Sequence, residues 1–100
     1  MTDERQILVP PDFLQLYQDP RTSRLTVTRP WVEDRHELCE DFSQMLTEQV
    51  RQRVLDLKIT QTDALERVAR GLDAEPAPLD LSVREIGWVK SRLAELLRHG

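Results

Sequence analysis

The sequence predicts an all-α protein, a small antiparallel helical bundle of one short and three longer helices with an extended N-terminal arm. In residues 28–58, apolar side chains recur at the three- and four-residue spacing of one broad helix face. Only three glycines and five aromatic residues occur in the 100 residues, which disfavours a β-sandwich or a β-barrel. Capping residues and helix breakers divide the rest of the chain into shorter helical segments.

The chain begins with a polar segment, residues 1–6, which we expect to be disordered. Pro11 suits the first turn of a short helix, and Asp19-Pro20 ends that helix. Residues 21–28 alternate loosely between polar and apolar side chains. We expect an extended arm here and not a sheet, because a single strand has no partner to pair with.

The longest helix is expected between Thr28 and Lys58, with a length of about 40 Å at 1.5 Å per residue. Thr28 suits its N-cap, and Pro30 suits its first turn. Acidic side chains in the first half and basic ones in the last turns complement the helix dipole. Arg53 interrupts the apolar face, where it either extends to solvent or pairs with an acid from another helix. The face is wide enough to contact two neighbouring helices and consists of Trp31, Val32, Leu38, Cys39, Phe42, Met45, Leu46, Val50, Val54 and Leu57.

Two further helices are expected in the C-terminal half. Thr60 suits the N-cap of the first of them, and Gly71 its C-terminal stop. Residues 72–81 form a linker that two prolines stiffen. Ser82 and Glu85 have the spacing of a capping box at the start of the last helix. Its core stripe is expected to be Ile86, Val89, Leu93, Leu96 and Leu97.

Charge and composition restrict the classes of function. The net charge of −4 disfavours nucleic acid, because phosphate binding needs a surplus of Lys and Arg on one face. A single cysteine cannot form an internal disulfide, which favours a reducing compartment. No signal peptide is expected, and no apolar run approaches the roughly 18 residues of a membrane span. We therefore expect one helical domain over residues 1–100, cytoplasmic, with no membrane partner, cofactor or metal.

Three segments resemble a group of small, uncharacterised proteobacterial proteins. They are ELCEDFSQMLTEQV (37–50), ALERVARGL (64–72) and IGWVKSRLAELL (86–97). The resemblance covers most of the chain from Val9 onward. Some members of the group carry the label "ATPase with chaperone activity", but the group has no agreed catalytic residues that could be assigned to this chain, so the resemblance bears on the extent of the fold.

The residues themselves argue against that activity. A P-loop needs several glycines before a Lys-Ser or Lys-Thr pair. Gly71, Gly87 and Gly100 are isolated from one another, and Lys90-Ser91 lies within a predicted helix. We therefore expect neither nucleotide binding nor catalytic residues, and a protein that is not an enzyme.

Two other patterns suggest alternative functions. Glu33 and His36 have the Glu-x-x-His spacing of di-iron bundles, so a metal-dependent enzyme could form across a dimer that supplies the second copy. Cys39 lies one turn from His36, but we expect it to be a buried core residue. Residues 60–72 resemble a helix-turn-helix, as in a DNA-binding regulator, although two acids on the second helix would repel phosphate.

The favoured hypothesis is a protein-interaction or regulatory module with its contact surface on the last helix. Trp88 lies about 130° from the centre of the core stripe, beside Gly87, so it is either a contact residue or covered by the N-terminal arm. Gly87 destabilises a helix by up to about 1 kcal/mol, which is best tolerated where a backbone or a ring comes close. Arg84, Lys90 and Arg92 would give this surface a basic rim for an acidic partner, which is another protein or a second copy of the chain.

Overall fold

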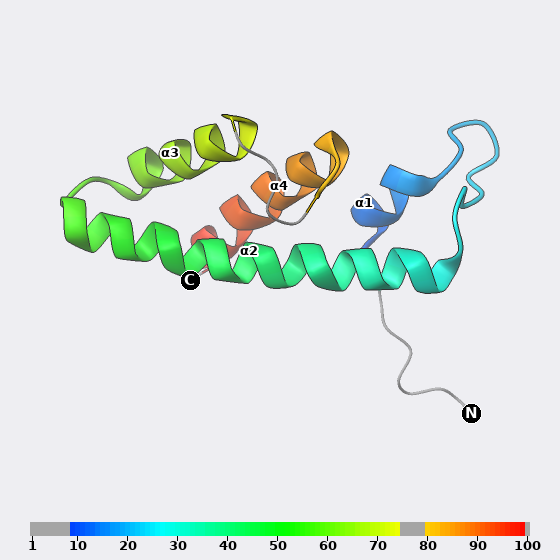
Figure 1. Cartoon of the computed structure of the whole chain (residues 1–100), viewed down its shortest axis with the longest axis horizontal. Coiled ribbons are helices and arrows are strands. Elements are labelled where there is room, and N and C mark those ends of the chain that lie inside the picture. The colour runs from blue at the N-terminus through cyan, green and yellow to red at the C-terminus, as the bar shows by residue number, and fades with distance from the viewer. Residues whose placement is uncertain (1–8, 75–79, 100) are drawn as a thin grey trace, which may run out of the picture. The chain divides into compact units, whose positions relative to one another are not determined.

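The computed structural model describes residues 9–74 and 80–99, and most of these residues lie in helices (Figure 1). No strand of a sheet occurs among them, and the predicted all-α fold class is confirmed. None of the helices in these two ranges has the length and apolar character that a membrane span requires. The elements are α1 (Pro11–Leu14), the 3-10 helix η1 (Gln15–Tyr17), α2 (Arg29–Leu57), α3 (Gln61–Ala74) and α4 (Val83–His99).

The chain divides into two compact units, residues 1–38 and residues 39–100. Because α2 spans residues 29–57, it contributes to both units. Residues 1–6, which we expected to be disordered, lie outside the described residues, and the single domain stays a prediction.

In the first unit, the segment after η1 folds back instead of running as an extended arm. The backbone N–H of Thr26 donates to the carbonyl of Tyr17 at 2.7 Å, and that of Asp19 donates to the carbonyl of Arg24 at 2.8 Å. Ser23 has a φ of 62°, in the left-handed region that a tight turn requires. The turn that the sequence predicts at Asp19 therefore begins a closed loop, in which backbone N–H and C=O groups of this segment hydrogen-bond to each other.

Hydroxyl caps begin two of the longer helices, as the sequence predicts. The backbone N–H of Trp31 donates to Thr28 Oγ1 at 3.3 Å at the start of α2. The backbone N–H of Asp63 donates to Thr60 Oγ1 at 3.1 Å at the start of α3. Each bond satisfies one of the four donors that a helix N-terminus leaves without an intrahelical partner.

The start of α4 is a complete capping box. The backbone N–H of Glu85 donates to Ser82 Oγ at 3.1 Å, and the backbone N–H of Ser82 donates to Glu85 Oε1 at 2.9 Å. Glu85 is almost fully buried, so its carboxylate makes this bond away from bulk water. Leu81 and Ile86, at the two positions of a hydrophobic staple, are also buried.

The prediction that Gly71 stops α3 is wrong, because the helix continues to Ala74. No described glycine has a positive φ. Leu72 and Val68 are buried on the same side of α3, so continuing the helix past Gly71 buries apolar surface that outweighs the weak helix propensity of one glycine. A left-handed residue does follow α2, but it is Lys58, with a φ of 55°.

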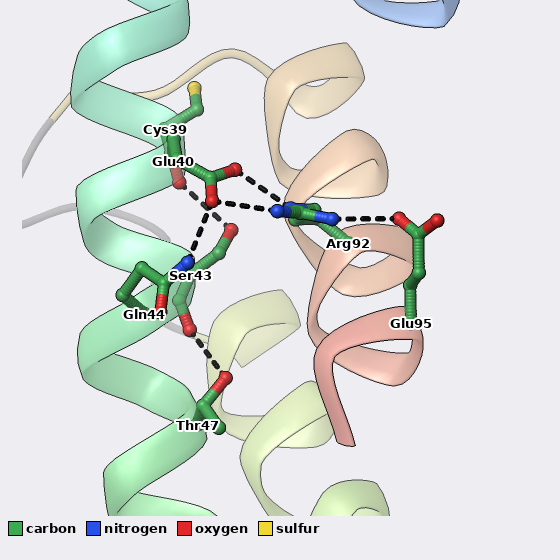
Figure 2. A network of polar contacts seen from close by, with 7 residues as sticks. All are labelled: Cys39, Glu40, Ser43, Gln44, Thr47, Arg92 and Glu95. Atoms are coloured by element: carbon green, nitrogen blue, oxygen red, sulfur yellow. Dashed lines mark hydrogen bonds and ion pairs between the residues drawn. The ribbon is translucent and has the colours of Figure 1, made fainter. Parts of the chain in front are cut away.

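The second unit holds three antiparallel segments: the C-terminal part of α2, then α3, which runs in the opposite direction, then α4, which reverses again (Figure 1). The buried face of α2 differs from the predicted one, because Met45 is 48% exposed while Ser43 and Thr47 are buried. Ser43 Oγ donates to the carbonyl of Cys39 at 2.8 Å, and Thr47 Oγ1 donates to that of Ser43 at 2.9 Å (Figure 2). These bonds let two hydroxyl side chains enter the core without an unsatisfied polar atom. The buried apolar residues of this unit are Cys39, Phe42, Leu46, Val50, Ala64, Val68, Leu72, Leu81, Ile86, Trp88, Val89, Leu93 and Leu97.

Cys39 is fully buried, as predicted, and we expect its thiol to be unreactive in the native protein. Labelling with a chromogenic disulfide reagent should be slower than in guanidinium chloride by on the order of 100-fold or more, because the reagent has to wait for an opening of the structure. Free cysteine at the same pH provides the reference rate. Complete labelling of native protein within seconds would contradict the burial of Cys39.

Candidate functional site

Trp88, which the sequence left as either a contact residue or a residue covered by other parts of the chain, is buried, with 7% of its surface exposed. An open contact surface centred on the Trp88 side chain is therefore not what the structure presents. Glu85, Trp88 and Arg92 are three and four residues apart and share one side of α4. Arg92 contacts Glu40 of α2, so this side packs within the protein. The core stripe predicted from the sequence contained only aliphatic residues. It therefore omitted this second buried side of α4, where two of the three residues, Glu85 and Arg92, are charged.

Arg92 forms a bidentate ion pair and does not belong to an open basic rim. Its Nε donates to Glu40 Oε1 at 2.8 Å and its Nη2 to Glu40 Oε2 at 2.9 Å, while Nη1 donates to Glu95 Oε1 at 3.0 Å (Figure 2). Gln44 Nε2 donates to Glu40 Oε2 at 2.8 Å and holds that carboxylate from its own helix. The hydrogen bond with Glu40 raises the pKa of Arg92 above its ordinary value, and partial burial opposes this shift.

Lys90 also has a partner within the chain, because its Nζ lies 2.5 Å from Asp73 Oδ1 and joins α4 to α3. Arg84 is exposed near the start of α4. Two of the three cations expected to attract an acidic partner are thus neutralised by carboxylates of this chain. Lys90 and Arg92 thus lend less charge to a basic rim on α4 than the sequence suggested, and the rim stays a prediction.

Gly87 has open space above it, and the expectation that a backbone or a ring approaches it closely is wrong. A Cβ added there would meet no heavy atom within 4 Å. Gly87 is exposed and lines a hollow of about 250 Å³ between the end of α3 and the start of α4. Val83, at the mouth of the hollow, is 89% exposed. We call this feature the Gly87 hollow, and its lining residues are Leu72, Asp73, Leu81, Val83, Ile86, Gly87 and Lys90.

The residues of the metal hypothesis lie in the first unit, and both have partners there. Glu33 Oε2 lies 3.4 Å from Arg29 Nε, and the ring of His36 packs edge-on against Phe13 with centroids 5.3 Å apart. No group of three or more His, Cys, Asp or Glu residues is placed to hold a metal ion anywhere in residues 9–74 and 80–99. A dimeric metal site stays a hypothesis.

The residues of the DNA-binding hypothesis lie on α3. Asp63, Glu66, Arg67 and Arg70 are exposed, and Glu66 Oε1 lies 4.0 Å from Arg70 Nη2. The two carboxylates of this surface would repel a phosphate backbone. DNA binding therefore stays an untested alternative.

The Gly87 hollow combines the features of a small contact site. Its lining is mainly aliphatic, its rim carries the Lys90–Asp73 ion pair, and an exposed valine stands at its mouth. Comparisons of this chain with protein-family models, with curated proteins and with solved structures found no match. The Gly87 hollow is therefore proposed as the candidate functional site from its lining residues, its ion pair and its exposed valine alone.

Proposed function

We propose that this chain is a non-enzymatic, cytoplasmic helical module that binds a protein partner, or a second copy of itself, through the Gly87 hollow. The observation that carries the proposal is Val83, which is 89% exposed beside an aliphatic hollow. Full burial of a valine side chain contributes about 1.5–3 kcal/mol, so covering Val83 would be a substantial part of a binding energy. The Lys90–Asp73 pair on the rim offers a donor and an acceptor that orient the partner.

The substitution Gly87→Leu tests this proposal, because it places a side chain inside the hollow. The free energy of unfolding should be unchanged or raised by about 0.5–1 kcal/mol, since leucine favours a helix more than glycine does and the added Cβ meets no atom. Binding should weaken by at least about 10-fold because the hollow is filled. Gly71→Leu is the matched control, as Gly71 is an exposed helical glycine with equally open space and does not line the hollow.

Two measurements read out binding. Sedimentation velocity over a range of concentrations reports self-association, and affinity capture from extracts of the source organism with quantitative mass spectrometry reports partners. We expect association or captured proteins that wild type and Gly71→Leu share and Gly87→Leu loses. Equal retention by Gly87→Leu, or no association with any protein by wild type, would refute the proposal.

A further inference from the structure

A second surface lies at the other end of the second unit, where α2 ends. Leu57 is 49% exposed there, although it belongs to the predicted apolar face of α2. It lies in an open hollow of about 330 Å³, which we call the Leu57 hollow, together with Gln49, Gln52, Arg53 and Asp56. Leu55 is 71% exposed and lines a separate hollow of about 260 Å³ with Arg51, Val54 and Gln61. The last two turns of α2 therefore keep two leucines in water, on different sides of one helix.

The charges around these leucines are mostly positive. Residues 51–58 contain Arg51, Arg53 and Lys58 but only one carboxylate, Asp56, in a chain whose net charge is −4. Neither Arg53 nor Lys58 lies within ion-pair distance of a carboxylate among the residues that the structure describes. This contrasts with Lys90 and Arg92, which are both paired.

The neighbouring polar groups are already satisfied locally. Arg51 Nη1 lies 3.2 Å from Glu48 Oε2, and Asp56 Oδ1 accepts a hydrogen bond from Gln52 Nε2 at 3.0 Å. Arg53 and Leu57 are four residues apart, so they lie on the same side of α2. Among the described residues, the Leu57 hollow thus presents a guanidinium without an ion-pair partner, one helical turn from an exposed leucine.

From this juxtaposition we infer that the Leu57 hollow docks an acidic amphipathic segment of a partner protein. An apolar side chain of that segment covers Leu57, and a carboxylate one helical turn away pairs with Arg53. Arginine suits this role because its planar fork binds a carboxylate through two hydrogen bonds. The surplus of positive charge over residues 51–58 attracts an acidic segment and disfavours a basic one. This surface is separate from the Gly87 hollow, since the two share no lining residue.

A pair of synthetic helical peptides tests the inference with the full chain. One carries leucines on one face and glutamates on the other, and the second has lysine at every glutamate position. By fluorescence anisotropy, the wild-type protein should bind the glutamate peptide at least about 10-fold more tightly than the lysine peptide. The preference should shrink as salt is raised, because exposed charges are screened.

Three variants locate the binding. Leu57→Ser should weaken the binding of the glutamate peptide by about 10-fold, and Arg53→Glu should reverse the preference between the two peptides. Arg67→Glu makes the same change of charge on the exposed surface of α3, and it should shift either affinity by less than about 2-fold. All three positions are exposed, so circular dichroism should show unchanged folding.

Several outcomes would overturn the inference. They are equal binding of the two peptides, a preference that Arg53→Glu and Leu57→Ser leave in place, or an equal effect of Arg67→Glu. Leu57-dependent self-association without peptide binding would assign the surface to a second copy of this chain, and binding of anionic lipid vesicles alone would assign it to a membrane surface. Gly87→Leu should not change peptide binding, so this inference and the proposed function can fail independently.

Discussion

Replacing Trp88 with alanine should lower the free energy of unfolding by about 3–5 kcal/mol. The side chain is 7% exposed on the side of α4 that also carries the buried Glu85 and the paired Arg92. Truncation removes a large apolar surface from this side and leaves a cavity that the surrounding helices can close only in part. In a chain of 100 residues, a loss of this size should lower the melting temperature by more than about 10 °C.

Urea titration followed by circular dichroism measures the effect of Trp88→Ala, and Trp31→Ala provides the control with the same change of side chain. Trp31 is 43% exposed, packs against Tyr17 in a T-shaped arrangement and has the Arg35 guanidinium over its ring, so its replacement should cost about 1 kcal/mol. A melting temperature that Trp88→Ala leaves unchanged would contradict the burial and would restore Trp88 as a surface residue.

Breaking the pair between Glu40 and Arg92 should also destabilise the fold, by about 1–3 kcal/mol for either single alanine substitution. The two side chains are 23% and 30% exposed, so the bidentate pair is shielded in part from water. It joins residues 52 positions apart in the sequence and fixes α4 to α2. Removing Glu40 leaves Arg92 with Glu95 as a more exposed partner, and removing Arg92 deprives the part-buried carboxylate of Glu40 of this cation while Gln44 still donates to it.

A double-mutant cycle separates the pair from the packing of its two side chains. The double alanine variant should be less destabilised than the sum of the single variants, with a coupling energy of about 1–2 kcal/mol. The exposed pair between Arg51 and Glu48 serves as the reference, with an expected coupling below about 0.5 kcal/mol. A coupling energy for Glu40 and Arg92 no larger than this reference would show that the pair contributes nothing beyond a surface contact.

The charge of Arg92 determines how the stabilisation by this ion pair should depend on pH. The pKa of Arg92 is raised in the folded protein, so its contribution to the free energy of unfolding is complete below the pKa of an ordinary arginine. That contribution declines only as the pH rises through the pKa of the folded state. Arg92 is thus charged at every pH at which the protein can be studied. Any pH dependence of the coupling energy should therefore appear on the acid side, where carboxylates become protonated.

The parts of the fold that the sequence predicts well are those that neighbouring residues decide. Thr28, Thr60 and Ser82 each cap a helix in the predicted way, because a cap depends on a side chain and a backbone N–H only three residues apart. The burial of Cys39 also follows from its place on an apolar stripe.

The failures concern residues whose surroundings come from distant parts of the chain. Gly71 remains helical because Leu72 is buried beyond it, and Arg92 is occupied because Glu40 comes within reach from another helix. Nothing near these residues in the sequence carries that information. The sequence did contain one indication that Trp88 is buried, because Glu85, Trp88 and Arg92 have the spacing of one helix side. Two of these three residues are charged, however, so this side resembles one that faces solvent.

Gly87 does line the Gly87 hollow, but not for the reason that the sequence suggested. Its place within a helix predicted close packing against a backbone or a ring, whereas the structure shows open space at that position. The exposure of Val83 depends on where α3 ends relative to α4, and the sequence alone does not specify that relation.

The bonds of Ser43 and Thr47 bear on how freely this core can vary in evolution. Each hydroxyl finds its acceptor on its own helix, so side chains of other helices that face these residues need to provide only shape. A polar pair between two helices can change only when both members change together, whereas this arrangement lets the facing positions drift one substitution at a time among apolar residues of similar volume. Two buried polar residues thereby leave the surrounding core as tolerant of mutation as an entirely aliphatic one.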